Sequence, residues 1–179
     1  MPGKYMVADG SIVLRTYAGS TLVVCLYDET LGIGGITNFI VPGFGRDASI
    51  TESQSAEFGI AHIEYIIADV IKRGGTRTQL KAKLFGLARI SNSGRPDDDI
   101  AADISFIWQY MRNEKIPVTR HDLESRTYKE IIFFPEEGRV YARPVTDSVI
   151  LKEIVRSEDA YIVRETKAFS GKTVYVLFR

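Results

Sequence analysis

Two apolar stretches separated by a polar, glycine-containing segment dominate the first quarter of the chain. Residues 20–27 (STLVVCLY) and 36–41 (ITNFIV) are rich in β-branched and aromatic side chains, and DETLGIGG joins them. Such side chains favour strands, and a short polar segment with glycine favours a turn. The pattern therefore predicts a β-hairpin. Shorter runs of the same kind predict further strands at residues 5–8, 12–16, 80–88, 118–121, 129–134 and 139–143.

Two other segments carry apolar residues at the three- and four-residue spacing of a helix. The first covers residues 56–73, where Ile63, Ile66 and Val70 recur on one face before a glycine pair ends the pattern. The second covers residues 98–114, and the aspartates at its start suit the positive end of a helix. The order strands, helix, strand, helix, strands predicts an α+β fold. We expect a layered sandwich of mostly antiparallel or mixed sheet with two main helices packed on it.

The chain length of 179 residues predicts one domain with an appended tail. We place the domain at residues 1–145 and a C-terminal extension at residues 146–179. The extension holds short apolar runs at residues 149–155, 160–164 and 173–178. These runs predict that it is β-rich and that it is packed on the domain or appended to it.

The overall charge is balanced, because 23 Lys and Arg residues face 23 Asp and Glu residues. A nucleic-acid-binding protein usually carries a basic excess, so no nucleic-acid partner is expected. No run approaches the roughly 20 apolar residues that cross a bilayer, so no membrane insertion is expected. The single cysteine suits a reducing compartment, and the start of the chain lacks an apolar signal segment. These features predict a cytoplasmic protein.

Common metal and cofactor signatures are missing from the sequence. The two histidines, His62 and His121, are far apart and no cysteine pair accompanies them, so we expect no metal. The glycines of residues 32–35 are not followed by the Gly-Lys-Ser/Thr of a phosphate loop and predict a turn instead. We expect no cofactor. Cys25 lies inside an apolar strand, so an inert, buried thiol is predicted.

The stretch GSTLVVCLYDETLGIGGITNFIVP resembles the CheD family of chemoreceptor glutamine deamidases. The family pattern is roughly GSC-V-x-V-CLYD, a short linker and GG-x-x-H-x-x-LP. Later stretches resemble further family segments in the correct order, namely KAKLFGLA, IPVTRHD and IIFFPEEGRVYAR. Within the first of these, Gly86 is kept and Leu87 replaces the next glycine of the family pattern. The resemblance covers about residues 4–145 and implies a CheD-like fold.

The resemblance implies a cysteine nucleophile, a histidine base and an assisting threonine, and this chain departs from that set. Thr21 stands at the cysteine position, Asn38 at the histidine position, and Thr16 close to the position of the upstream threonine. A threonine hydroxyl does not ionise near neutral pH without a strong base, and an asparagine amide is not a base. We therefore predict that the site lacks deamidase activity. Candidate binding residues beside it are Gly19, Ser20 and Gly35.

The sequence leaves three functions open. The first is a CheD-like binding module without deamidase activity, whose partners by resemblance are a CheC-type phosphatase or a methyl-accepting chemoreceptor. The second is an active glutamine deamidase or hydrolase that uses Thr21 with an unidentified base, such as His121 or an aspartate. The third is reuse of the fold for another interaction through the tail from Thr146. In each case Thr21 and Asn38 are expected to be cross-strand neighbours joined by a hydrogen bond.

Overall fold

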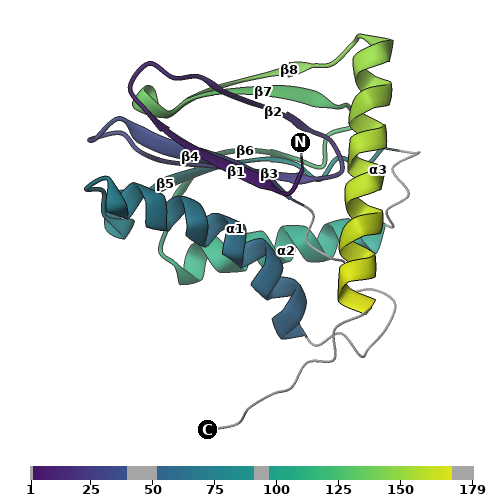
Figure 1. Cartoon of the computed structure of the whole chain (residues 1–179), viewed down its shortest axis with the longest axis horizontal. Helices are drawn as coiled ribbons and strands as arrows, with labels where there is room; N and C mark the ends of the chain where they lie inside the picture. Colours follow the sequence, from purple (N-terminus) through teal and green to yellow (C-terminus); the bar gives the residue numbers. More distant parts are fainter. Residues whose placement is uncertain (1, 40–51, 91–96, 171–179) are drawn as a thin grey trace, which may run out of the picture.

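Two β-sheets form the centre of the molecule in the computed structural model, which describes residues 2–39, 52–90 and 97–170 (Figure 1). The larger sheet has the strand order β1-β4-β3-β5-β6 and is antiparallel except for the pair β5–β6. Its strands are β1 (Lys4–Asp9), β4 (Ile33–Phe39), β3 (Leu22–Asp28), β5 (Lys81–Gly86) and β6 (Val118–Leu123). The smaller sheet is antiparallel and contains β2 (Leu14–Ala18), β7 (Lys129–Phe134) and β8 (Arg139–Pro144), in that order.

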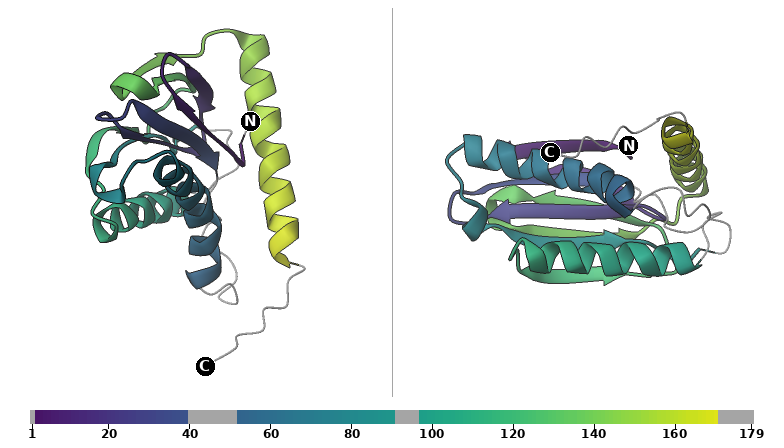
Figure 2. Two further views of the ribbon diagram at one scale, coloured as in Figure 1. Left: turned by 60° about the vertical axis from the view of Figure 1, so that its left-hand side comes forward. Right: turned by 90° about the horizontal axis from the view of Figure 1, so that it is seen from below.

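Helices cover one face and one end of these sheets. Helices α1 (Glu52–Lys72) and α2 (Asp97–Asn113) lie on one face of the five-stranded sheet, and the three-stranded sheet lies on the other face (Figure 2). Helix α3 (Ser148–Ser170) stands across one end of the layers (Figures 1 and 2). Two short 3₁₀ helices, η1 (Arg77–Gln79) and η2 (Pro135–Glu137), complete the connections.

Strand β3 belongs to the cores on both sides of its sheet, and all seven of its residues are buried. The side chains that pack with α1 and α2 are Leu22, Val24 and Leu26, and those between the two sheets are Val23, Cys25 and Tyr27. A strand with two buried faces needs apolar residues at every position. The uninterrupted run LVVCLY is therefore the sequence signature of the central strand of a three-layer sandwich.

The structure confirms the predicted α+β fold, with two helices on one face of a mostly antiparallel sheet. The predicted hairpin is formed by β3 and β4. Its turn covers residues 29–32, so Gly34 and Gly35 belong to strand β4 rather than to the turn. The last two residues of the predicted second strand, 40 and 41, lie outside the described residues.

The predicted β-rich character of the C-terminal extension is wrong. The strands expected at residues 149–155 and 160–164 are parts of one helix, α3. The strand expected at residues 173–178 lies outside the described part of the chain. The division of the chain at residue 145 stays a prediction, because no observation tests whether the first part forms a unit of its own.

A cap and a buried stripe explain why this segment is helical. Asp147 Oδ1 accepts hydrogen bonds from the backbone nitrogens of Val149 at 2.8 Å and Ile150 at 3.1 Å. These bonds give an acceptor to two backbone N–H groups of the first turn, which have no partner within the helix. Among the described side chains of the helix, the buried ones follow at spacings of four and three residues: Ile154, Glu158 and Tyr161. The short apolar runs are therefore successive turns of one amphipathic helix.

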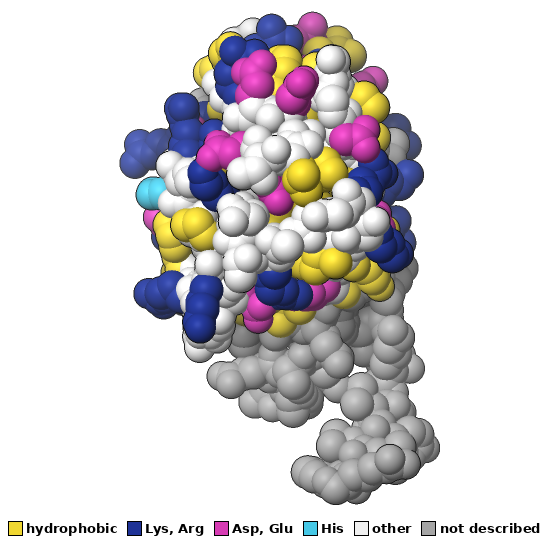
Figure 3. Space-filling model, turned by 90° about the vertical axis from the view of Figure 1, so that its left-hand side faces the viewer, with side chains coloured by type: hydrophobic (Ala, Val, Ile, Leu, Met, Phe, Trp, Pro, Cys, Tyr) yellow, Lys and Arg dark blue, Asp and Glu magenta, His cyan; other side chains and the backbone are white. Residues whose placement is uncertain are grey.

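The surface carries both signs of charge. On the face opposite α3, basic and acidic side chains are interspersed with small apolar patches, and neither sign forms a continuous stripe there (Figure 3). None of the helices among the described residues is long and apolar enough to cross a membrane.

Candidate functional site

The backbone before strand β3 is held by the end of strand β5. The backbone nitrogen of Leu87 donates to the Thr21 carbonyl oxygen at 3.0 Å, and that of Ala88 donates to the Gly19 carbonyl oxygen at 2.9 Å. Gly86 has φ +100°, and a Cβ atom there would overlap the Thr21 carbonyl oxygen. Only glycine permits this approach, so Gly86 places the backbone of residues 19–21.

Asn38 lies near the end of β4, opposite Val23 of β3. Because Thr21 is two residues before Val23, Thr21 and Asn38 belong to the same side of the sheet. Asn38 Nδ2 donates to Thr16 Oγ1 at 3.1 Å and to the Tyr17 carbonyl oxygen at 2.7 Å. Asn38 thereby ties β4 to β2 of the smaller sheet. Its Oδ1 atom has no hydrogen-bond partner among the residues that the structure describes.

The hydrogen bond predicted between Thr21 and Asn38 is wrong, because the Thr21 hydroxyl has a different partner. It donates to Glu158 Oε1 of helix α3 at 3.1 Å. Glu158 Oε2 accepts two more hydrogen bonds, from Ser20 Oγ at 2.7 Å and from the Ser20 backbone nitrogen at 3.1 Å. We call the group of Gly19, Ser20 and Thr21 the carboxyl cradle, since both oxygens of one carboxyl group are bound there.

Gly19 makes room for this carboxyl group. A Cβ atom at Gly19 would lie 2.7 Å from Glu158 Oε1 and would overlap the ring of Tyr128. Glu158 itself is only 2% exposed. Burial raises the pKa of its carboxyl group, while the hydrogen bonds from Ser20 and Thr21 act in the opposite direction. Burial and the neighbouring Glu158 also raise the pKa of Tyr128.

A cavity of about 210 Å³ adjoins the cradle between helix α3 and the sheets. On the sheet side it is lined by Thr16, Tyr17 and Asn38, and on the helix side by residues that include Ile154, Ser157 and Glu158. The structure thus brings two of the predicted site residues, Thr16 and Asn38, to one cavity. Thr21 is fully buried beside it, under Glu158.

The remaining predicted residues lie elsewhere. A Cβ atom at Gly35 would lie 2.7 Å from Ile66 Cγ2, so this glycine permits the packing of α1 against β4 and faces away from the cradle. His121 lies in β6 with its ring against Trp108 (5.2 Å between centroids), and His62 lies 3.3 Å from Thr37 Oγ1. Neither histidine is bonded to the Thr21 hydroxyl, whose partner is Glu158.

Cys25 is fully buried between the sheets, as predicted, and burial raises the pKa of its thiol. Within the described ranges, no three His, Cys, Asp or Glu side chains are grouped so that they would hold a metal ion. The chemistry available at the cradle is therefore that of hydroxyl groups, a backbone amide, one carboxyl group and one carboxamide.

Sequence reasoning missed Glu158, because the tail was predicted to form strands. One signal was available in the sequence. At helical spacing, Glu158 falls on the same stripe as Ile154 and Tyr161. A carboxylate in the buried stripe of a helix needs hydrogen-bond donors from a neighbouring element, and this need marks it as a site residue.

Comparisons with known proteins give the family of this chain. The family model described as CheD chemotactic sensory transduction matches residues 41–144, which is more than half of the chain. The chain belongs to the CheD family. The match to the family model begins after β4, so Thr21 and Asn38 of this CheD-family chain lie outside it.

Individual relatives align over nearly the whole chain. A probable chemoreceptor glutamine deamidase CheD of Burkholderia vietnamiensis is 29% identical over 96% of this chain and 73% of the relative. A probable chemoreceptor glutamine deamidase CheD 1 of Shewanella oneidensis is 31% identical over 97% of this chain and 84% of the relative. The corresponding protein of Methylobacillus flagellatus is 30% identical over 92% of this chain and 81% of its own length.

Proposed function

We propose that this CheD-family chain is a binding module of a chemotaxis system that holds a partner side chain without deamidating it. The observation that carries the proposal is the bonding of the cradle. Ser20 N, Ser20 Oγ and Thr21 Oγ1 all donate to one carboxyl group, which is an arrangement for holding a polar side chain. The residues at the two positions that the resemblance assigns to catalysis, Thr21 and Asn38, are poor substitutes for a thiol and an imidazole.

The chemistry of deamidation explains why this difference matters. A thiol beside a histidine ionises readily and attacks a carboxamide carbon, whereas a threonine hydroxyl needs a base to remove its proton. Asn38 donates through Nδ2 to Thr16 and Tyr17, and its amide accepts no proton near neutral pH. Binding without turnover follows if no other group supplies the base.

A chemoreceptor is the first partner to test. The relatives are named as probable chemoreceptor glutamine deamidases, and two of them align with 96% and 97% of this chain and with 73% and 84% of their own lengths. A CheC-type phosphatase is the second partner to test, on the resemblance alone. Both partners imply that the chain works in the cytoplasm.

The test is a deamidation assay by mass spectrometry on cytoplasmic fragments of chemoreceptors from the same organism, with binding measured in parallel by pull-down. We expect the native chain to bind without converting glutamine to glutamate. The double change Thr21→Cys and Asn38→His is expected to restore conversion, and Thr21→Val with Asn38→His is the matched control without a thiol. Conversion by the native chain, or binding to neither the receptor nor a CheC-type partner, contradicts the proposal.

A second function, an active hydrolase, is favoured by one distance. Thr21 Oγ1 lies 3.1 Å from Glu158 Oε1, which is within reach for proton transfer. In this alternative the Glu158 carboxylate takes the hydroxyl proton and the threonine oxygen attacks the amide carbon. The proton then leaves with ammonia, and water hydrolyses the ester. Thr21→Ala and Glu158→Gln must both abolish conversion in the assay above, and conversion that survives either change removes this alternative.

A further inference from the structure

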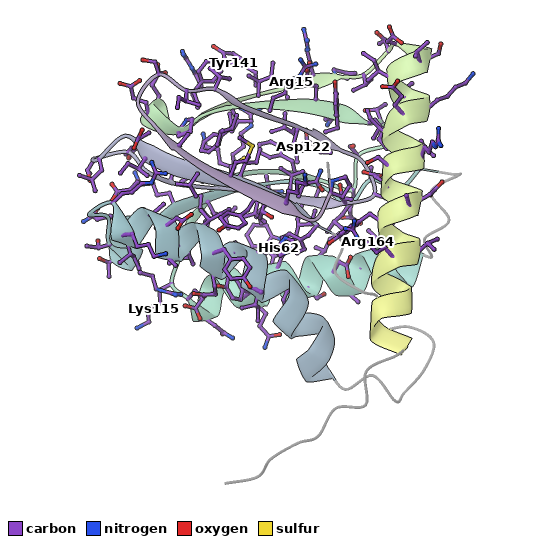
Figure 4. All side chains as sticks on the ribbon, in the orientation of Figure 1. Arg15, His62, Lys115, Asp122, Tyr141 and Arg164 are labelled. Carbon is purple, nitrogen blue, oxygen red and sulfur yellow. The ribbon has the colours of Figure 1, made fainter. Side chains whose placement is uncertain are left out.

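Helix α3 contacts the rest of the molecule through a narrow stripe with a polar centre. Of the α3 side chains that the structure describes, the buried ones are Ile154, Glu158 and Tyr161, whereas Val149 and Val163 are 64% and 52% exposed. Figure 4 shows Arg164 on the side of α3 that faces the layers, where its guanidinium lies 5.1 Å from the centre of the Tyr161 ring. The carboxyl group of Glu158, at the centre of this stripe, is the group that enters the carboxyl cradle.

The cradle presents hydrogen-bond donors. The Ser20 backbone nitrogen can only donate, and the Ser20 and Thr21 hydroxyls both donate to Glu158 in the structure. A carboxylate accepts all three bonds with its two oxygens. A carboxamide offers one oxygen and one NH₂ group. Because the NH₂ group can only donate, one hydroxyl of the cradle would have to accept a hydrogen bond instead of donating one. The cradle therefore favours a glutamate side chain over a glutamine side chain.

The fit of α3 beside the cradle is incomplete. The helix covers the cavity of about 210 Å³ without filling it. Asn38, which lines this cavity, is 4% exposed, and its Oδ1 atom lacks a hydrogen-bond partner within the described part of the chain. A buried acceptor without a partner costs free energy, which an occupant with a suitably placed donor would recover. The site is therefore suited to a better occupant than α3.

We propose that α3 is an intramolecular ligand of the carboxyl cradle, and that an external helix bearing a glutamate binds there by displacing α3. A helix is the partner that this surface fits, because the occupant is a helix with apolar side chains about one turn on either side of its glutamate. The inference rests on the proposed function only for the source of that helix in a chemotaxis partner. The docking of α3 is independent of it.

The first test measures hydrogen exchange of the α3 backbone amides in the full chain. Glu158→Gln keeps the size of the side chain and removes the carboxylate, while Thr21→Val removes one donor of the cradle at constant shape. Each change is expected to accelerate exchange in α3 by about tenfold, with exchange in β3 unchanged. Asp159→Asn, at the neighbouring exposed position, is the control and leaves exchange in α3 unchanged.

The second test supplies the helix in trans. Two synthetic peptides with the sequence of residues 148–170, one with Glu and one with Gln at position 158, are added to the full wild-type chain and to the full Glu158→Gln chain. The Glu peptide is expected to accelerate α3 exchange in the wild-type chain. It should also bind the Glu158→Gln chain about tenfold more tightly than the wild-type chain. The reason is that the peptide competes with the chain's own α3 for the cradle, and the Glu158→Gln change weakens the docking of α3. The Gln peptide is expected to bind more weakly.

The outcomes that overturn the inference are specific. One is unchanged hydrogen exchange of α3 in both Glu158→Gln and Thr21→Val. The other is equal binding of the two peptides. If Glu158→Gln fails to fold, Thr21→Val alone decides the exchange test. Failure of the proposed function is seen separately, as conversion of receptor glutamine by the native chain. That conversion leaves the exchange and peptide results unaffected.

Discussion

The hydroxyl at position 21 and the serine before it show how single side chains set the chemistry of this site. A threonine hydroxyl stays protonated near neutral pH, so the interaction that it offers there is a hydrogen bond rather than covalent attack. The structure has such bonds from Thr21 and from Ser20 to a buried carboxyl group. Each donor reduces the cost of burying Glu158, so the loss of one donor is expected to appear directly in stability.

Ser20→Ala provides the residue-scale test. The change removes the 2.7 Å hydrogen bond from Ser20 Oγ to Glu158 Oε2, so this buried carboxyl oxygen loses one of its hydrogen-bond donors. We expect the free energy of unfolding in urea to fall by about 1–3 kcal/mol. Ser11→Ala, at an exposed position, is the control and should change it by less than about 0.5 kcal/mol. Equal effects of the two changes would refute the role assigned to Ser20.

At the scale of elements, helix α3 and the pair α1–α2 are attached by different means. Among its described side chains, helix α3 contributes three that are buried, and one of these carries a carboxyl group. Helices α1 and α2 share a large apolar core with the sheet and are also joined by an ionic clamp. We therefore expect α3 to open locally at a lower free energy than the other two helices.

The attachment of α3 is expected to depend on pH. Burial raises the pKa of Glu158 above the ordinary value of 4.5, so the folded state binds this proton more tightly than the unfolded state. The contribution of such a group to stability is complete below the unfolded value and is lost as pH rises through the folded value. The free energy of unfolding of the wild-type chain, relative to Glu158→Gln, should therefore decrease from about pH 4 towards neutrality. A relative increase over this range contradicts the assignment, and Asp159→Asn serves as the control.

Arg77 of η1 forms the clamp between α1 and Glu114, the residue that follows α2. Its guanidinium lies 2.5 Å from Glu64 Oε2 and also pairs with Glu114, while the Tyr110 hydroxyl donates to Glu64 Oε1 at 2.6 Å. Burial acts to raise the pKa of Glu64, but the bonds from Arg77 and Tyr110 outweigh it, so the pKa lies below its ordinary value. This contribution is present above the unfolded value and is lost as pH falls through the folded value.

Arg77→Ala is accordingly expected to lower the free energy of unfolding at neutral pH by about 1 kcal/mol, after allowance for solvent screening. The matched control is Arg73→Ala, since Arg73 forms an ion pair with the exposed Asp9 at 2.7 Å. This control should cost less than about 0.5 kcal/mol in the same urea titration. A larger loss in Arg73→Ala than in Arg77→Ala would contradict the clamp.

For the whole molecule, burial between the two sheets predicts how Cys25 reacts. The residue is fully buried, and burial raises the pKa of its thiol. A thiol reagent can reach it only when the sheets separate, so labelling should follow global unfolding and accelerate with urea. Ser11→Cys, with a thiol at an exposed position, is the control that labels at once. Rapid labelling of Cys25 in the native protein would contradict the closed sandwich.

Much of the architecture followed from the sequence alone. The run LVVCLY predicted a strand of the hairpin, and the spacing of Ile63, Ile66 and Val70 predicted one of the two helices on the sheet. These are local patterns, and period-two and period-3.6 burial can be recognised without knowledge of the partner element. The family resemblance likewise depended on local motifs, and the family comparisons agree with it.

Tertiary structure decided the site. Glu158 lies 137 residues after Thr21 in the chain, and the tail around it showed strand-like runs in short windows although it forms a helix. No local pattern determines which end of the sandwich a helix covers, because that choice depends on surfaces formed by β2, β3 and β4 together. The family resemblance grouped Thr21, Asn38 and Thr16 at one site before the fold was known. The carboxyl group that binds the cradle, and the cavity beside it, arise only when α3 packs against the folded sheets.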